Sequence, residues 1–230
     1  MASAALDIPA PASRRRQHRA RRAGGGAPLT LALLCLIAPP QSPSAAGATD
    51  ATASINQHAL IQAVQARAQQ GDAQAQFDLA TAYDSGHAVA ADPARAVYWY
   101  RRAARQQHAL AQFNLGVALE DGLAGQPNPR QARHWYRQAA AQGLPEAQSN
   151  LGRLWASGAL GETRFDLARR WFTAAAAQHH APAQYNLGVM HELGLATAVN
   201  HAMACRRYRA AADYAPAGAA AKRVCPTAEP

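Results

Sequence analysis

The sequence has few of the residues from which catalytic and metal sites are usually built. It holds three cysteines and three methionines in 230 residues, and charged residues make up only 16%. It contains no glycine-rich phosphate loop, no Cys-x-x-Cys pair and no His-Glu-x-x-His motif, and no serine lies in a nucleophile-elbow context. Turnover needs a positioned acid, base or nucleophile. We therefore expect no enzyme activity and no cofactor.

Lysine is almost absent, since Lys222 is the only one, and nearly all positive charge comes from arginine. The formal net charge is +9, but it is spread unevenly. Residues 1–48 hold six arginines against one acidic residue, whereas residues 49–230 hold 17 basic and 13 acidic residues. A nucleic-acid-binding domain usually carries a strong basic excess over its body. We therefore expect no nucleic-acid partner.

Residues 1–48 have the pattern of an export signal. An arginine-rich segment precedes an apolar run of ten residues from Leu29 to Ala38, and Ala46-Gly47-Ala48 resembles a cleavage site. The run is shorter than the roughly 20 residues that span a membrane. We expect cleavage after Ala48 and a periplasmic or secreted mature chain without a transmembrane segment. An uncleaved anchor is the alternative.

The rest of the chain repeats every 36 residues without a gap. The repeats are 73–108, 109–144, 145–180 and 181–216. Three non-alanine columns keep this step: Gln76, Gln112, Gln148 and Gln184; Leu79, Leu115, Leu151 and Leu187; Gly86, Gly122, Gly158 and Gly194. Such a period indicates a repeat architecture.

Each repeat has the pattern of two helices. Leu79 and Tyr83 lie on one helical face, and the recurring glycine is placed just past the helix end, where a positive φ is common. Asp92-Pro93 and Asn128-Pro129 are helix starts, whereas Arg164 predicts an irregular third cap. The alanine columns and three glycines permit close helix packing, and we expect tryptophans to fill the space beside the glycines: Gly116, Gly152 and Gly188; Trp99, Trp135 and Trp171.

One helical hairpin cannot bury both faces of its helices, so neighbouring hairpins must stack. The predicted fold is all-α: a right-handed α-solenoid of four helix-turn-helix repeats with capping helices at both ends. Residues 49–54 are a linker, residues 55–72 an N-terminal capping helix, and residues 217–230 a C-terminal capping helix and tail.

The repeat resembles the Sel-one-like repeat family. The resemblance lies in Ala111-Gln112-Phe113-Asn114-Leu115-Gly116, then Gly122, then Ala132-x-x-Trp135-Tyr136-Arg137-Gln138-Ala139-Ala140. It implies a tetratricopeptide-like solenoid that serves as a protein–protein adaptor, often exported in bacteria, with the first helices lining a concave groove. The family's second glycine is replaced here by Ala88, Ala124, Leu160 and Ala196. The paired cysteines of its β-lactam-binding branch are absent.

Charge is segregated between the two kinds of helix. The first helices of the repeats carry six acidic residues against one arginine, and the second helices carry 13 arginines against three acidic residues. Acidic residues at helix C-termini oppose the helix dipole. They either face a basic or extended partner or pair with arginines of neighbouring helices. The candidate partner-binding residues are Phe77, Asp78, Asp84, Phe113, Asn114, Glu120, Asn150, Tyr185, Asn186 and Glu192.

Two cysteines remain after removal of the signal peptide. Cys205 and Cys225 each lie ten residues from the centre of a predicted turn at 214–216, so an antiparallel hairpin would bring them together. We expect a disulfide in an oxidising compartment, with two free thiols as the alternative. His201 and Cys205 share a helix face, but no further ligand is evident and we expect no metal site.

These observations favour an exported, non-enzymatic scaffold that holds a protein or peptide in its groove. Two alternatives are a cell-wall-related enzyme of the β-lactam-binding kind and an anion- or glycan-binding envelope factor that uses the arginine-rich convex face.

Overall fold

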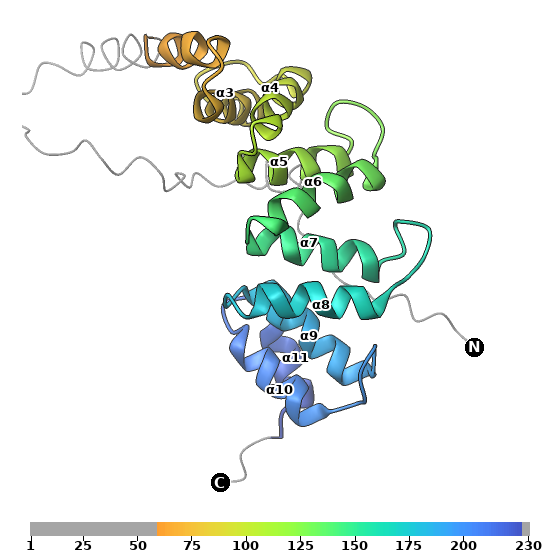
Figure 1. The fold of residues 1–230 in the computed structure, drawn as a ribbon. Coiled ribbons are helices and arrows are strands. Elements are labelled where there is room, and N and C mark those ends of the chain that lie inside the picture. The colour runs from red at the N-terminus through yellow and green to blue at the C-terminus, as the bar shows by residue number, and fades with distance from the viewer. Residues whose placement is uncertain (1–58, 227–230) are drawn as a thin grey trace, which may run out of the picture. The chain divides into compact units, whose positions relative to one another are not determined.

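The computed structural model describes residues 59–226, so the predicted signal peptide and the linker lie outside the described residues. Every regular element within 59–226 is a helix (Figure 1). The described residues form two compact units that divide between Trp99 and Tyr100, and each unit is described by itself. The all-α repeat fold predicted from the sequence is confirmed.

The first unit contains helical residues 59–69, α3 (Ala73–Ser85) and the beginning of α4 (Pro93–Arg105). The Asp72 side chain accepts a hydrogen bond from the backbone N of Ala75 at 2.9 Å and so caps α3. The same carboxylate binds Arg67 Nη2 at 2.6 Å. Gln76 Nε2 donates to the carbonyl of Ala68 at 3.0 Å. These bonds fasten the described part of the predicted capping helix to the first repeat.

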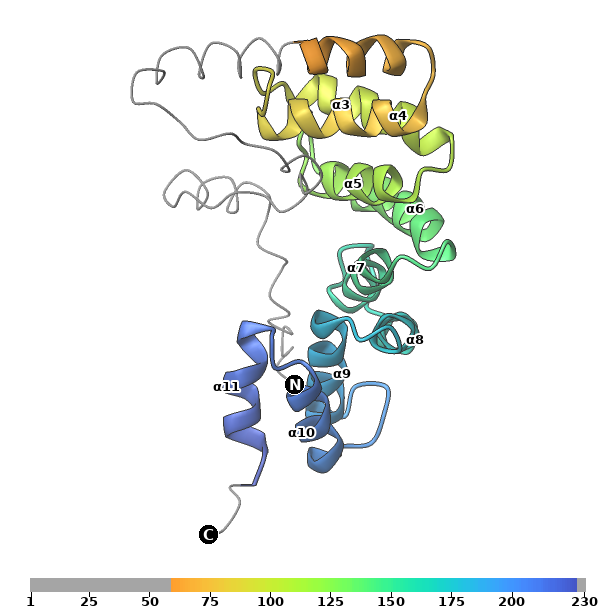
Figure 2. The same ribbon diagram turned by 90° about the vertical axis from the view of Figure 1, so that its left-hand side faces the viewer.

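The second unit is a stack of hairpins. Its helices are α5 (Ala109–Glu120), α6 (Pro129–Ala141), α7 (Pro145–Ala156), α8 (Phe165–Ala176), α9 (Ala181–Leu193), α10 (His201–Ala210) and α11 (Ala215–Val224). Each second helix packs against its own first helix and against the next first-type helix, and α11 lies against α10 (Figure 2). The last helix begins two residues before the predicted 217, because Tyr214 is its N-cap and Pro216 fits its first turn.

A backbone hydrogen bond closes the turn inside every repeat. The same bond recurs every 36 residues along the chain: Asp92 N to Tyr83 O, Asn128 N to Leu119 O, Arg164 N to Trp155 O and Asn200 N to His191 O. Because only the carbonyl is used, the side chain at the acceptor position is free to vary. The recurring glycine precedes this bond with φ between 66° and 73°, which confirms its predicted left-handed conformation.

The second helices begin largely as the sequence predicts. Asn128 Oδ1 accepts from Gln131 N at 3.0 Å, and Asn200 Oδ1 accepts from Met203 N at 2.8 Å. Arg164 makes no side-chain capping bond, so the irregular third cap is confirmed.

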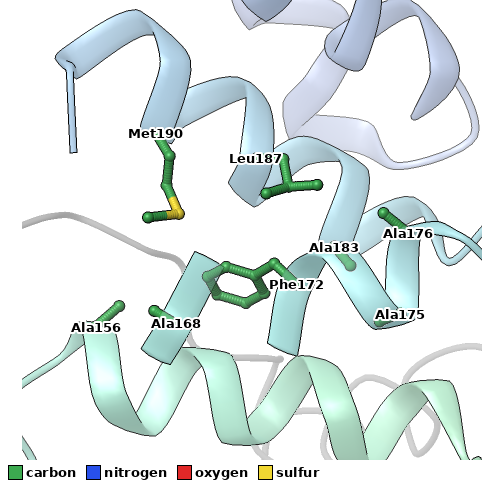
Figure 3. Close-up of a cluster of buried hydrophobic side chains, with 8 residues drawn as sticks. All are labelled: Ala156, Ala168, Phe172, Ala175, Ala176, Ala183, Leu187 and Met190. Carbon is green, nitrogen blue, oxygen red and sulfur yellow. The ribbon is translucent and has the colours of Figure 1, made fainter. Parts of the chain in front are cut away.

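Close packing at the three helix glycines is confirmed, but the aromatic partner is different from the one predicted. A Cβ added to Gly116, Gly152 or Gly188 would lie 2.5–2.6 Å from ring carbons of Tyr136, Phe172 or Tyr208. These three rings are fully buried, whereas Trp135 and Trp171, one position earlier, are half-buried. Phe172 stands at the centre of one such cluster with Leu187 and Met190 (Figure 3). The tyrosine and phenylalanine column therefore forms the core that the tryptophans were expected to fill.

Candidate functional site

The recurring glutamine is a structural residue. Its Nε2 donates to a carbonyl in the last turn of the preceding second helix, which also accepts a backbone N–H from the turn that follows. In the second unit these bonds run from Gln112 to Ala104 (3.1 Å), from Gln148 to Ala140 (3.3 Å) and from Gln184 to Ala176 (2.8 Å). All three glutamines are buried. The strongest column of the sequence therefore joins successive repeats and is not offered to a partner.

The other end of each glutamine is also used. Gln142 and Gln178 donate to the side-chain oxygens of Gln112 and Gln148 at 2.8 and 3.0 Å. In the last repeat Arg207 Nη1 donates to Gln184 Oε1 at 2.9 Å. Arg207 stands where the other repeats have tryptophan. The replacement of tryptophan by arginine therefore provides the donor for Gln184 Oε1.

Glu120, at the end of α5, has two partners inside the protein. The Tyr136 hydroxyl donates to Glu120 Oε2 at 2.9 Å, and Arg153 Nη2 binds both oxygens of the carboxylate. The side chains of Glu120 and Arg153 are only 17% and 12% exposed. Burial, together with the negative charge of Glu120, raises the pKa of Tyr136 well above its ordinary value. The three groups join α5, α6 and α7.

Glu192, at the equivalent position of α9, repeats this arrangement. Tyr208 donates to Glu192 Oε2 at 2.5 Å, and Arg223 Nη2 binds the two carboxylate oxygens at 2.8 and 2.9 Å. Burial and the hydrogen bond to Glu192 raise the pKa of Tyr208. Of the two roles left open for the acidic residues, pairing with a neighbouring arginine is the one that the structure shows for Glu120 and Glu192.

The third repeat lacks both members of this acid–tyrosine pair. Ala156 stands at the acidic position and Phe172 at the tyrosine position, 16 residues later. Asn186 belongs to the same column as Asn114 and Asn150. It is only 7% exposed, and its buried Oδ1 has no hydrogen-bond partner among the described residues. The acid and the phenol thus change together along the 36-residue period. This joint change is the sequence signal that could have revealed the pairs.

The remaining candidates of the second unit are also partly engaged. Asn114 Nδ2 donates to the Tyr100 hydroxyl at 3.4 Å, and Asn150 hydrogen-bonds to the Tyr136 hydroxyl. Both asparagines are half-buried. The asparagine column therefore has a structural role beside any contact with a partner.

The two aromatic candidates of this unit pack on the core. The ring of Phe113 lies 5.9 Å from that of Tyr136, and the ring of Tyr185 lies 5.6 Å from that of Tyr208 and 5.4 Å from that of Tyr214. In the first unit, Asp78 is exposed and accepts a hydrogen bond from Gln74 at 2.8 Å, and Phe77 and Asp84 are half-buried.

One face of the first helices forms what we call the first-helix stripe. On each helix it consists of four residues, of which the last three follow the first by 4, 7 and 11 positions: Leu110, Asn114, Val117 and Asp121; Glu146, Asn150, Arg153 and Ser157; Pro182, Asn186, Val189 and Leu193. Leu110, Glu146, Ser157 and Leu193 are exposed, whereas Asn186 is buried and the others are half-buried. Leu110 and Leu193 are 46% and 52% exposed. The only other large apolar side chain so exposed in residues 100–226 is Val199, in a loop. Sequence analysis missed both leucines because charge guided the choice of candidates.

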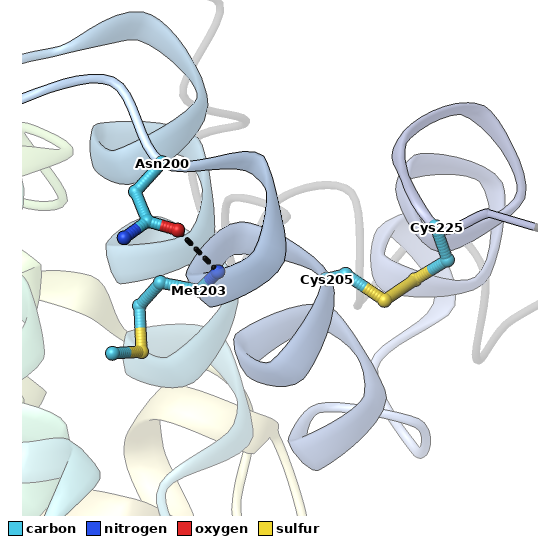
Figure 4. The surroundings of a disulfide bond; sticks show 4 residues. All are labelled: Asn200, Met203, Cys205 and Cys225. Atoms are coloured by element: carbon cyan, nitrogen blue, oxygen red, sulfur yellow. Dashed lines mark hydrogen bonds between the residues drawn. A yellow bond between two sulfur atoms is a disulfide. The ribbon is translucent and has the colours of Figure 1, made fainter.

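Cys205 and Cys225 are joined by a disulfide, with their Cα atoms 5.0 Å apart (Figure 4). Cys205 is buried on α10, and Cys225 directly follows α11. The bond lies at the same end of the unit as the pair of Arg223 and Glu192. Two links, one covalent and one ionic, therefore hold α11 on the last repeat.

Two further findings concern only residues 59–226. None of their helices combines the length and apolar character needed to cross a bilayer. No group of three or more histidine, cysteine, aspartate or glutamate side chains lies together in an arrangement that could hold a metal ion there.

The stacked hairpins and their repeated ties define a helical repeat protein. A family model described as Sel1 repeat matches residues 73–108, 109–144, 145–180 and 181–213. The chain belongs to the Sel1 repeat family, whose members generally serve as scaffolds for protein interaction. A comparison with curated proteins gave no match.

Solved structures of the same repeat class resemble the chain. A Sel1 repeat protein from Oxalobacter formigenes is 28% identical with a TM-score of 0.63, and the match covers 66% of this chain and 63% of that one. The protein c5321, a protective antigen of uropathogenic Escherichia coli with an SLR fold, is 27% identical with a TM-score of 0.52. That match covers 74% of this chain and 44% of the antigen. The chain thus spans less than two thirds of either protein.

Proposed function

We propose that this protein is an exported, non-enzymatic scaffold that binds a protein partner through its first-helix stripe. Membership of the Sel1 repeat family supports the scaffold role. The arginine-rich start, the short apolar run and the small residues at 46–48 support export and cleavage after Ala48. The likeness to an antigen of a pathogenic bacterium accords with a place in the cell envelope or outside it.

The choice of the first-helix stripe as the binding surface rests on its exposed leucines. Protein interfaces have an apolar centre and a polar rim. Leu110 and Leu193 supply exposed apolar area at the two ends of the stripe, and Asn114 and Glu146 supply polar groups between them. Because Glu120 and Glu192 are already paired with arginines, the first helices present less unpaired acidic charge to a partner than their sequence suggests. A partner with an apolar side chain in an extended or helical segment fits it better than a purely basic one.

The test compares three forms of the chain in affinity capture from an envelope fraction. We expect a partner that binds the wild type to be lost from the double variant Leu110→Asp/Leu193→Asp. The matched control is Val199→Asp, which changes an exposed apolar residue outside the stripe and should retain the partner. Loss from the control alone, or retention by the double variant, would contradict the proposed surface. The N-terminal residue of the captured chain tests export separately, and we expect Thr49.

A further inference from the structure

The outward side of the second helices has a different character from the first-helix stripe. On α6 the outward positions hold Arg130, Arg133 and Arg137. On α8 they hold Arg169 and Arg170. On α10 they hold Arg206 and Arg209, in the register of α6 and α8. All seven side chains are exposed. We call these seven residues the arginine stripe.

None of the seven forms an ion pair with another described residue. Asp166 on α8 is the equivalent of Arg130 on α6, 36 residues later. It is already bound by Arg164 through two hydrogen bonds of 3.0 Å. Arg133 lies over the ring of Trp155 with its guanidinium carbon 5.3 Å from the ring centre, a contact that brings no negatively charged group to it. The stripe therefore carries a local positive charge that the near-neutral count of the mature chain conceals.

Most neighbouring arginines of the stripe repel one another along their helices, although Arg209 lies in the last turn of α10, where a cation is favourable. Arg130 and Arg133, Arg133 and Arg137, and Arg206 and Arg209 are three or four residues apart, where like charges on a helix destabilise it. Their positions are consequently better explained by an external anion than by stability.

The stripe lacks what a protein interface needs at its centre. Binding energy between proteins is concentrated in apolar and aromatic anchors, and no exposed large apolar side chain of the described residues lies on α6, α8 or α10. An anionic lipid surface needs no such anchor. Its phosphates are mobile, and each guanidinium binds a phosphate through two parallel hydrogen bonds.

We propose that the arginine stripe docks this protein peripherally on a membrane surface rich in anionic phospholipid. The first-helix stripe lies on the other helices of each hairpin, so it is left open to its partner. The proposal does not depend on the identity of that partner or on its binding.

The test is sedimentation with vesicles of phosphatidylglycerol and phosphatidylcholine in equal parts, compared with phosphatidylcholine alone. Residues 49–230 are used beside the full chain, because they contain every described helix and lack the arginines of residues 14–22, which would bind vesicles themselves. We expect binding to the mixed vesicles only, and its loss as salt rises from 0.1 to about 1 M, where charges are screened within about 3 Å.

The stripe variant is Arg130→Gln/Arg137→Gln/Arg170→Gln. Each arginine near an anionic surface contributes about fivefold to partitioning, so we expect a loss of roughly a hundredfold. The control Arg67→Gln/Arg95→Gln/Arg164→Gln removes the same charge from outside the stripe and should change binding much less. Circular dichroism shows whether each variant is folded, and Arg206→Gln/Arg209→Gln replaces the stripe variant if it is not.

Three results would overturn the proposal. The first is equal loss in the stripe and control variants, which would indicate a response to net charge alone. The second is equal binding to neutral vesicles. The third is binding of poly-glutamate through the stripe without binding to anionic vesicles, which would assign the stripe to an acidic polypeptide.

Discussion

At the scale of single residues, four residues other than glycine within 59–226 adopt a positive φ, a conformation that favours glycine. Ala88 (φ 65°) and Ala196 (φ 50°) occupy the position where the family usually has its second glycine. Gln107 (φ 63°) and His179 (φ 59°) alternate along the chain with Gly71 and Gly143 at the turn between repeats. The turn between repeats thus has a left-handed residue at a fixed step, filled alternately by glycine and by a residue with a Cβ, whereas the second-glycine step is left-handed only in the first and last repeats.

We expect Ala88→Gly and Ala196→Gly each to raise the free energy of unfolding by about 0.5–1 kcal/mol. Relief of the left-handed strain, about 1–2 kcal/mol, exceeds the entropy that glycine adds to the unfolded chain. Ala124 occupies the same step without a positive φ, so Ala124→Gly should lower stability by about 0.5 kcal/mol. Urea unfolding measures all three, and a loss in Ala196→Gly equal to that in the control would contradict the explanation.

The two buried tyrosines predict how stability depends on alkaline pH. The pKa values of Tyr136 and Tyr208 are raised in the folded state by burial and by Glu120 and Glu192. Below about pH 10 the phenols are protonated in the folded and unfolded states. Above it only the unfolded chain loses these protons, so the folded state is progressively disfavoured.

We therefore expect the double variant Tyr136→Phe/Tyr208→Phe to lose stability less steeply than the wild type between pH 10 and 11. The difference in slope should approach about 1.4 kcal/mol per pH unit for each tyrosine removed. Tyr98→Phe, which removes an exposed hydroxyl, is the control. Parallel curves for wild type and double variant in urea titrations at several pH values would count against the buried acid–tyrosine pairs.

At the scale of elements, the terminal helix α11 buries fewer residues than any other helix of the second unit. It buries only two alanines, Ala217 and Ala220, and includes Gly218, which weakens a helix by about 1 kcal/mol relative to alanine. The Cys205–Cys225 disulfide and the pair of Arg223 and Glu192 compensate for this weak core. A disulfide closing a loop of about 20 residues stabilises by roughly 3 kcal/mol in the chain-entropy account.

Mass spectrometry of the exported chain, alkylated without reduction, should find neither Cys205 nor Cys225 modified. After reduction, hydrogen exchange should quicken in residues 215–224 and change little in α7 and α8, because only α11 depends on the bond. Arg223→Gln in the oxidised protein is the control and should quicken exchange there less than reduction does. Two alkylated cysteines in the unreduced chain would show that packing alone holds α11.

The positions of the helices were largely predictable from the sequence, because residues within each repeat mark where its helices begin and end. The glycine after the first helix and Asn128 or Asn200 before the second act locally, within one turn of the chain. The aromatic core was assigned to the wrong column. Trp135 and Tyr136 are adjacent, and a helical pattern alone does not say which of two neighbouring rings faces the glycine of another helix.

The site was less predictable for a related reason. Glu120 is bound by Arg153, 33 residues away, and Glu192 by Arg223, 31 residues away. Charge counts for each kind of helix cannot reveal such pairs, because Arg153 lies on a first helix and Arg223 on the terminal one. Part of the acidic charge that guided the choice of candidate residues is therefore already paired with arginines within the protein.

At the scale of the whole molecule, the hairpin of each repeat separates two kinds of surface chemistry. In residues 100–226 the first helices expose leucine and polar groups, and α6, α8 and α10 expose the seven residues of the arginine stripe, which form no ion pair with another described residue. The buried glutamines and the acid–tyrosine pairs lie between helices and hold the repeats in register. The fold is thus held by buried groups, and the exposed residues of both stripes are left for the binding that we propose.

Photo-cross-linking from defined positions tests this account most directly. A photoreactive phenylalanine analogue replaces Leu110, Leu193, Arg137 or Val199, one at a time, in the chain expressed with its natural partners present. The account predicts that positions 110 and 193 cross-link to the same protein, whereas positions 137 and 199 do not. Cross-links to that protein from position 137, with none from 110 or 193, would contradict the assignment of the partner to the first-helix stripe.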